Sequence, residues 1–150
     1  MFDPYEFFRL GQRLLQTWND EETHRTAIGR AYYACHLIAR DAMFGQDKKY
    51  LTGTLKKRIL GHRGGDHDTI VKAIAVHPRV PLGSLKTLSD QLGELKDARV
   101  QADYYCDPAH PGTLKLFTKY QVKDWNQLAH ATLAIASHVL PNLKGIPSWP

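Results

Sequence analysis

The chain has 150 residues, of which 43% are apolar and 23% are charged. This length suits one domain with a hydrophobic core, and the composition is not that of a disordered chain. The formal net charge of +5 permits an acidic partner, such as a nucleic acid or an acidic protein, without requiring one.

Two further classes are disfavoured by the sequence. No basic segment precedes an apolar run at the N-terminus, so we expect no signal peptide. No apolar stretch approaches the ~18 residues of a transmembrane helix, so we expect no membrane contact. Cys35 and Cys106 lack the spacing of a CxxC pair, and we expect both to be reduced thiols in a cytoplasmic protein.

The first helix is expected from about Pro4 to Trp18, because Asp3 and Glu6 resemble a capping box and apolar residues follow at helical spacing. The acidic segment 19–22 interrupts this pattern and supplies a cap for the next helix. That central helix, expected over Thr23–Phe44, carries two adjoining apolar stripes rich in alanine. Such a wide apolar face predicts packing against more than one neighbouring helix.

The segment 45–65 is punctuated by glycine and is basic, which predicts a loop with one short helix near Thr54–Leu60. Asp66 or Asp68 then caps a second short helix, which stops before Pro78. The basic side chains are either a solvated loop or a surface for RNA or an acidic partner. These nucleic-acid-binding candidates are Lys48, Lys49, Lys56, Lys57, Arg58 and Arg63.

Leucines at steps of three and four predict a helix from Ser84, its N-cap, to about Tyr105. After a loop, the last long helix is expected over Leu114–Leu140 and ends at Pro141. We therefore predict an all-α fold, an up-and-down bundle of four main helices plus one or two short helices. It forms a single domain with a core over about 3–140 and an extended C-terminal tail over 141–150.

Two segments carry a resemblance to a known family. One is Arg30-Ala31-Tyr32-Tyr33-Ala34, preceded by residues 25–29, and the other runs from Leu95 through Arg99 to Ala102-Asp103-Tyr104. Between them, His62 precedes a glycine-rich turn and an apolar helix. From about Asp3 to Leu140 the chain resembles the HEPN domain family (higher eukaryotes and prokaryotes nucleotide-binding). The resemblance implies a helical bundle that commonly dimerises and serves in prokaryotic defence and toxin–antitoxin systems.

Many HEPN domains are metal-independent ribonucleases with an arginine followed four to six residues later by a histidine. Counted from Arg99, that position falls on Tyr104, Tyr105 or Cys106, none of which shuttles protons near neutral pH as an imidazole does. The resemblance thus implies a non-catalytic or weakly active module. It would act through self-association or through a partner, such as a nucleotidyltransferase or another defence-system subunit.

Arg30 and His36 have the ribonuclease spacing but lie about 120° apart around a helix that turns ~100° per residue. They would share a site only if a dimer brought them together. In the simpler interpretation, Arg30 pairs with a carboxylate and His36 lies at a helix surface. A ribonuclease with a non-standard site would draw on Arg30, His36 or Arg99.

Arg99 and Asp103 are four residues apart, share a helical face and can pair, and Arg30 could join them from the central helix. With two tyrosines they form a candidate polar cluster: Arg30, Tyr33, Arg99, Asp103 and Tyr104. The cluster is either a groove for a phosphate or a ribose edge with tyrosines as stacking faces, or a buried ion pair that fixes helix register.

Asp66, His67 and Asp68 near His62 could suggest a metal site, but helix capping explains the two aspartates. We expect no metal and no cofactor. Three functions remain open at this point. They are a module that associates, a metal-independent endoribonuclease, and an RNA-binding subunit of a ribonucleoprotein defence complex.

Overall fold

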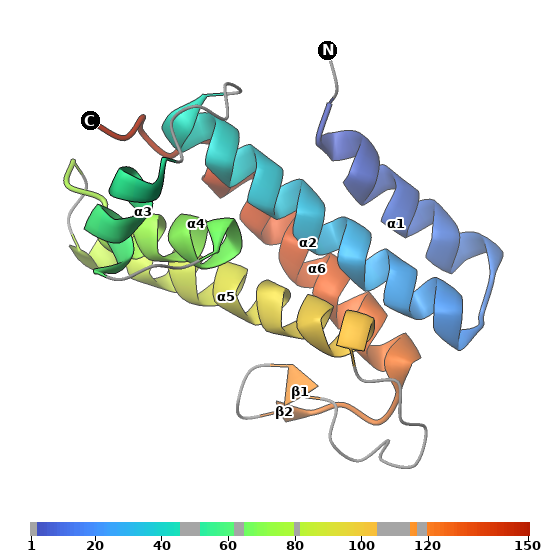
Figure 1. Ribbon diagram of the computed structural model, residues 1–150. Helices are drawn as coiled ribbons and strands as arrows, with labels where there is room; N and C mark the ends of the chain where they lie inside the picture. Colours follow the sequence, from blue (N-terminus) through green and yellow to red (C-terminus); the bar gives the residue numbers. More distant parts are fainter. Residues whose placement is uncertain (1–2, 46–51, 62–64, 80–81, 105–114, 117–119) are drawn as a thin grey trace.

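The computed structural model describes residues 3–45, 52–61, 65–79, 82–104, 115–116 and 120–150. In these residues the chain forms six helices and one short pair of strands (Figure 1). Four of the helices are long and two are short, so the predicted all-α bundle is confirmed. None of these helices combines the length and the apolarity that crossing a lipid bilayer requires.

The bounds of the first two helices agree with the sequence pattern, but Glu6 pairs with Arg9 and does not complete the capping box expected with Asp3. Helix α1 spans Tyr5–Thr17 and helix α2 spans Glu21–Phe44. The side chain of Asp20 accepts a hydrogen bond of 2.8 Å from the backbone N–H of Thr23, which satisfies one of the free donors at the start of α2. The expected cap of the central helix is therefore confirmed.

The short helices α3 (Gly53–Leu60) and α4 (Asp66–Ala75) lie where they are expected, but α4 is capped differently. Its N-cap residue is Gly65, and no side chain caps it, so the prediction that Asp66 or Asp68 does so is wrong. Both aspartates lie in the first turn of the helix and form ion pairs, Asp66 with Lys56 and Asp68 with Lys96. These pairs connect α4 to α3 and to α5 (Leu82–Tyr104).

The boundaries of the last two long helices differ from the prediction. Helix α5 begins at Leu82, so Ser84 is not its N-cap. Helix α6 spans Trp125–Lys144, and the expected helical start at Leu114 is wrong. Asp124 caps α6 by accepting a hydrogen bond of 2.8 Å from the N–H of Gln127. Before it, strands β1 (Lys115–Leu116) and β2 (Tyr120–Gln121) pair in an antiparallel register.

Pro141 does not end α6, contrary to the prediction. A proline removes the hydrogen bond to the carbonyl of residue 137 and its ring crowds that carbonyl. Both Pro141 and Ser137 are exposed, so the carbonyl can tilt outward and bind water. One residue later, Asn142 donates a side-chain hydrogen bond of 3.0 Å to the carbonyl of His138. This side-chain hydrogen bond helps to hold the last turn of α6.

The C-terminal residues pack on the bundle, so the core extends beyond the predicted limit of residue 140. Ile146 is buried, and the N–H of Trp149 donates a hydrogen bond of 2.7 Å to the carbonyl of Met43. The Trp149 ring lies 5.9 Å from that of Phe44 and 5.3 Å from that of His77. These contacts hold the tail against the end of α2.

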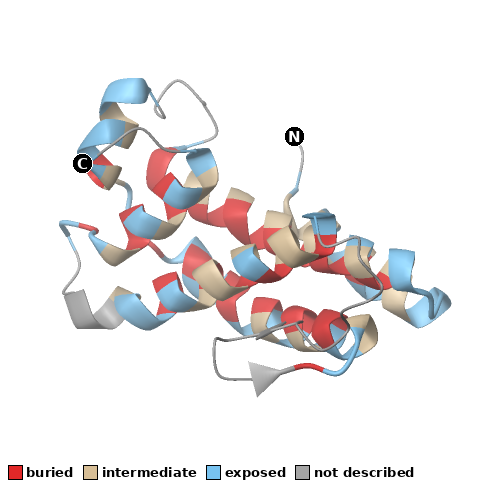
Figure 2. Ribbon diagram, turned by 60° about the horizontal axis from the view of Figure 1, so that its bottom comes forward, coloured by how far each residue is buried: buried red, intermediate tan, exposed pale blue. Residues whose placement is uncertain are grey.

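Helix α2 is the central element of the fold, as its two apolar stripes predict. It packs against α1, α4, α5 and α6, with α1 and α5 on opposite sides of it and α6 behind it in Figure 1. Its buried residues form the interior face seen in Figure 2, and they include the free thiol of Cys35. Cys106 lies outside the described residues. Helix α1 packs closely against α2 at Gly11, where an added Cβ would lie only 3.2 Å from the carbonyl oxygen of Ala27.

Candidate functional site

Arg99 is the centre of the predicted polar cluster, which the structure assembles in large part. Its Nε lies 2.6 Å from Oδ2 of Asp103, one helical turn further along α5, so the expected pairing is confirmed. Its Nη2 donates a hydrogen bond of 3.1 Å to the hydroxyl of Tyr33 on α2. The guanidinium carbon also lies 5.5 Å from the Tyr33 ring centre and 5.8 Å from that of Tyr104.

The Arg99 cluster (Tyr33, Arg99, Asp103 and Tyr104) is partly shielded from water. The side chain of Arg99 is 17% exposed, whereas that of Asp103 is 37% exposed and Tyr104 is 70% exposed at the helix end. The ion pair lies within α5 and orients the Arg99 side chain, and the hydrogen bond from Arg99 to Tyr33 connects α5 to α2. Separating the two charges would leave a largely buried guanidinium unpaired.

Two histidines meet beside this cluster, a feature that the sequence did not reveal. The rings of His36 on α2 and His67 on α4 are 4.3 Å apart between centres, and we call them the histidine pair. The hydroxyl of Tyr32 forms a hydrogen bond of 2.7 Å with Nδ1 of His67. His36 is only 5% exposed, so the interpretation that places it at a helix surface is wrong. Helix α4 covers that side of α2.

Both imidazoles are held in the neutral form at neutral pH. Burial lowers the pKa of His36 to about 3, and the neighbouring His67 and Arg40 lower it further in the same direction. Burial, followed by the positive charge of Arg99, also lowers the pKa of His67. Burial raises the pKa of Tyr32 well above its ordinary value, so its hydroxyl keeps its proton.

His67 and Arg99 border the same tyrosine, although they are far apart in the sequence. The ring of Tyr33 lies 5.9 Å from that of His67 and beneath the guanidinium of Arg99. The sequence suggested His67 only as a metal ligand. A signal was nevertheless present, because His67 precedes Ile70 and Ile74 by three and seven residues and so shares their buried helical face.

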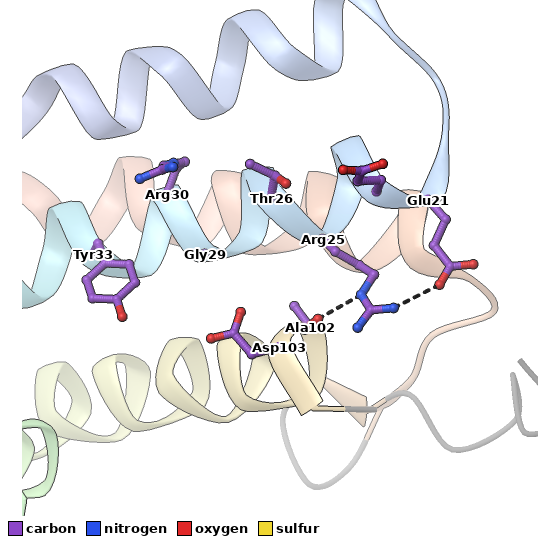
Figure 3. Close-up of a pocket in the computed structure, with 9 residues that line it drawn as sticks. Glu21, Arg25, Thr26, Gly29, Arg30, Tyr33, Ala102 and Asp103 are labelled. Carbon is purple, nitrogen blue, oxygen red and sulfur yellow. Dashed lines mark hydrogen bonds and ion pairs between the residues drawn. The ribbon is translucent and has the colours of Figure 1, made fainter. Parts of the chain in front are cut away.

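An open groove of about 610 Å³ runs between the first half of α2 and the end of α5 (Figure 3). Thr26, Gly29 and Tyr33 form its α2 side, and Ala102 and Asp103 form its α5 side. Tyr33 points from α2 toward α5, whereas Asp103 points from α5 toward α2. The groove and the Arg99 cluster therefore share two side chains.

Arg25 closes one end of this groove. Its Nε donates a hydrogen bond of 2.7 Å to the carbonyl of Ala102, the last turn of α5. Its Nη1 lies 3.2 Å from Oε1 of Glu21, one turn earlier on α2 (Figure 3). Arg25 also lies over the ring of Trp125 at 5.0 Å. This arginine ties together the ends of three helices.

Arg30 lines the groove but does not join Arg99 and Asp103, as the sequence suggested it could. Its guanidinium extends toward α1 and lies 5.2 Å from the ring centre of Phe7. Among the described residues it forms no ion pair, so the expectation that it pairs with a carboxylate is wrong. Asp103 is already paired with Arg99. Arg30 faces α1 while His36 contacts His67 on α4, so one chain does not bring Arg30 and His36 together.

The basic segment is only partly described. Lys56 pairs with Asp66, while Lys57 and Arg58 are exposed on α3. Several candidates from the sequence lie outside the described residues: Lys48, Lys49, His62, Arg63 and Tyr105. Where the structure places side chains, no three histidine, cysteine or acidic groups gather as a metal site would require.

No family model, no curated protein and no solved structure matches this chain. The residues described above are therefore the only guide to function. They offer three features: the paired Arg99 cluster, the neutral histidine pair and the open groove that contains Arg30.

Proposed function

We propose that this chain is a HEPN-like helical module that works by association, with a second copy or with a partner such as a nucleotidyltransferase. Its setting would be a prokaryotic defence or toxin–antitoxin type system, and the module itself would be non-catalytic or weakly active. The proposal starts from the resemblance carried by residues 25–34 and 95–104. The engagement of Arg99 is the observation that supports it.

A catalytic arginine must turn its donors toward the phosphate that reacts. Arg99 instead forms an ion pair with Asp103 and donates a hydrogen bond from Nη2 to Tyr33, and its side chain is 17% exposed. Freeing it would leave the carboxylate of Asp103 without its partner, at a cost of several kcal/mol for a buried pair and less for this half-exposed one. The arrangement therefore suits a structural role for Arg99.

Association needs a surface, and two exposed aromatic side chains suggest where it lies. Trp18 after α1 is 57% exposed and Tyr104 at the end of α5 is 70% exposed. Tryptophan and tyrosine are enriched at the centres of protein interfaces. The apolar face of α2 is buried within the chain and does not offer such a surface.

The test is to produce the tagged protein together with the product of its neighbouring gene. We expect co-purification of that product, or a dimer of the chain by light scattering. The variants Trp18→Ala and Tyr104→Ala should weaken the assembly, whereas the exposed control His130→Gln should not. A chain that stays monomeric and captures no neighbour would contradict the proposal.

A second candidate is a metal-independent endoribonuclease, which the position of His67 favours. This imidazole is neutral, is oriented by Tyr32 and lies beside Tyr33 and Arg99. A neutral imidazole can accept the proton of a ribose 2′-hydroxyl as its oxygen attacks the adjacent phosphorus. The P–O5′ bond would break as the imidazolium returns that proton to the 5′-oxygen, giving a 2′,3′-cyclic phosphate and a 5′-hydroxyl end. Arg99 would stabilise the phosphorane charge.

Labelled RNA incubated with the purified protein and a metal chelator separates the two candidates. The associating module predicts intact RNA. A ribonuclease predicts products with cyclic phosphate ends. His67→Gln and Arg99→Gln should abolish this cleavage, whereas the control His130→Gln should not. Arg30→Gln and His36→Phe test the two other candidates from the sequence. A salt-sensitive shift of uncleaved RNA would instead indicate the RNA-binding subunit.

A further inference from the structure

Arg30 is a half-buried cation without an acidic partner among the described residues. It lies on α2 with its guanidinium over the Phe7 ring, and it lines the groove shared with Tyr33 and Asp103. Arginines that are withdrawn from water usually have a carboxylate or phosphate partner. The two other arginines of this region have theirs, Arg25 with Glu21 and Arg99 with Asp103. The unmatched positive charge in the groove is therefore that of Arg30.

Gly29 leaves the floor of the groove open next to this charge. A Cβ at this position would meet nothing within 4 Å, so no described neighbour requires a glycine here. In a helix interior a glycine costs about 1 kcal/mol relative to alanine. Its φ angle is not among the positive ones, so backbone geometry does not require it either. What the glycine provides is space above the α2 backbone.

Three further groups of α2 face this space. Thr26 offers a hydroxyl one turn before Arg30, Tyr33 offers a ring face one turn after it, and Glu22 lies at the exposed end of the groove. Glu22 and Arg30 are eight residues apart, which is about 12 Å along a helix. An anion at Arg30 would thus be separated from the nearest unpaired carboxylate of α2.

We propose that the groove binds a small molecule that carries an oxyanion, a phosphate or a carboxylate, next to a planar ring. The oxyanion is held by the guanidinium of Arg30 and the hydroxyl of Thr26. The ring lies over Gly29 against Tyr33. A volume of about 610 Å³ is within the range of small-molecule sites, ~300–1,000 Å³. This site needs neither an associated partner nor RNA cleavage, so it stands apart from the proposed function.

Four simple probes test the proposal by amide chemical shifts in the intact chain. Phenyl phosphate and benzoate carry both features, inorganic phosphate lacks the ring and benzyl alcohol lacks the charge. We expect saturable shifts at Gly29 and Tyr33 with one or both of the first two, weaker binding of inorganic phosphate and no shift with benzyl alcohol. The tighter of phenyl phosphate and benzoate identifies the oxyanion.

Two variants and one control assign the binding to the groove. Arg30→Gln should weaken binding of the better probe by about tenfold or more, because it removes a charge-assisted contact. Arg13→Gln, an exposed arginine of α1, should leave binding unchanged. Gly29→Leu should abolish binding without lowering the melting temperature, since it fills the groove with a good helix former.

Three results would overturn the proposal. The first is binding of the better probe that survives both Arg30→Gln and Gly29→Leu in folded protein. The second is the absence of any shift at Gly29 with millimolar phenyl phosphate and benzoate. The third is a response to a short single-stranded oligonucleotide alone, which would indicate a nucleic-acid groove and not a small-molecule site.

Discussion

The histidine pair should make the protein sensitive to mild acid. Burial lowers the pKa of His36 to about 3 in the folded chain, whereas an unfolded histidine titrates near pH ~6.5. As the pH falls below the pKa of His36 in the unfolded chain, the unfolded state binds a proton that the folded state does not bind. Stability is therefore complete above about pH 6.5 and declines as the pH falls toward about 3.

The size of this effect follows from the two pKa values. Each pH unit between them lowers the free energy of unfolding by about 1.4 kcal/mol, so His36 alone should cost about 2 kcal/mol at pH ~5 relative to pH ~8. The pKa of His67 is lowered in the same direction, which adds to the loss. Protonating either ring also places a charge 4.3 Å from the other ring and near Arg99.

Urea unfolding at several pH values between about 5 and 8 measures this loss. The variant His36→Phe keeps a ring against Tyr32 and His67 but does not titrate, so its stability should fall by about 2 kcal/mol less than that of the parent chain over this range. The control His130→Gln, which removes an exposed histidine, should leave the pH dependence of the free energy of unfolding as it is in the parent chain. If His36→Phe and the parent lose equal stability on acidification, the assignment to His36 is refuted.

Three more predictions concern packing and reactivity. Gly93→Ala should raise the free energy of unfolding by about 1 kcal/mol, because the new Cβ would lie at an ordinary contact distance of 3.8 Å from Val71. Gly11→Ala should lower it by about 1 kcal/mol, because the new Cβ would lie only 3.2 Å from the carbonyl oxygen of Ala27. Urea unfolding measures both changes. Burial raises the pKa of Cys35 far above neutral, so a disulfide reagent at about pH 8 should label this thiol only in urea. Trp149→Ala should lower the free energy of unfolding, measured in urea, by about 2 kcal/mol, because the ring packs against Phe44. Trp149→Phe should lower it by less than about 1 kcal/mol, because the indole N–H has no hydrogen-bond partner among the described residues.

Most helices could be predicted because their signals are local. The Asp20 cap, the acidic first turn of α2 and the leucine spacing of α5 each act within one or two turns. The start of α6 could not be predicted from local signals. The apolar residues after Leu114 suit a helix, but the backbone at Lys115–Leu116 pairs with Tyr120–Gln121, and strand pairing depends on a partner segment.

The same distinction separates the parts of the site. The ion pair between Arg99 and Asp103 follows from a spacing of four residues on one helix. The contact of His36 with His67 depends on how α4 lies across α2, which no local pattern specifies. Both Arg30 and Arg99 could pair with Asp103 by sequence, and only the packed structure shows which of them does. Arg99 forms the ion pair, and the guanidinium of Arg30 lies over the Phe7 ring of α1.

Helix α2 shows why polarity on a central helix is informative. Its neighbours α1, α4, α5 and α6 cover most of its circumference, and there its side chains are small, apolar or aromatic. Between α1 and α5 it carries Thr26, Gly29 and Arg30 instead, and the groove opens at these residues (Figure 3). A helix that served only as core would gain stability from alanine or leucine at Gly29. The ligand proposed above would cover this strip, and Gly29→Leu tests stability and binding separately at a single position.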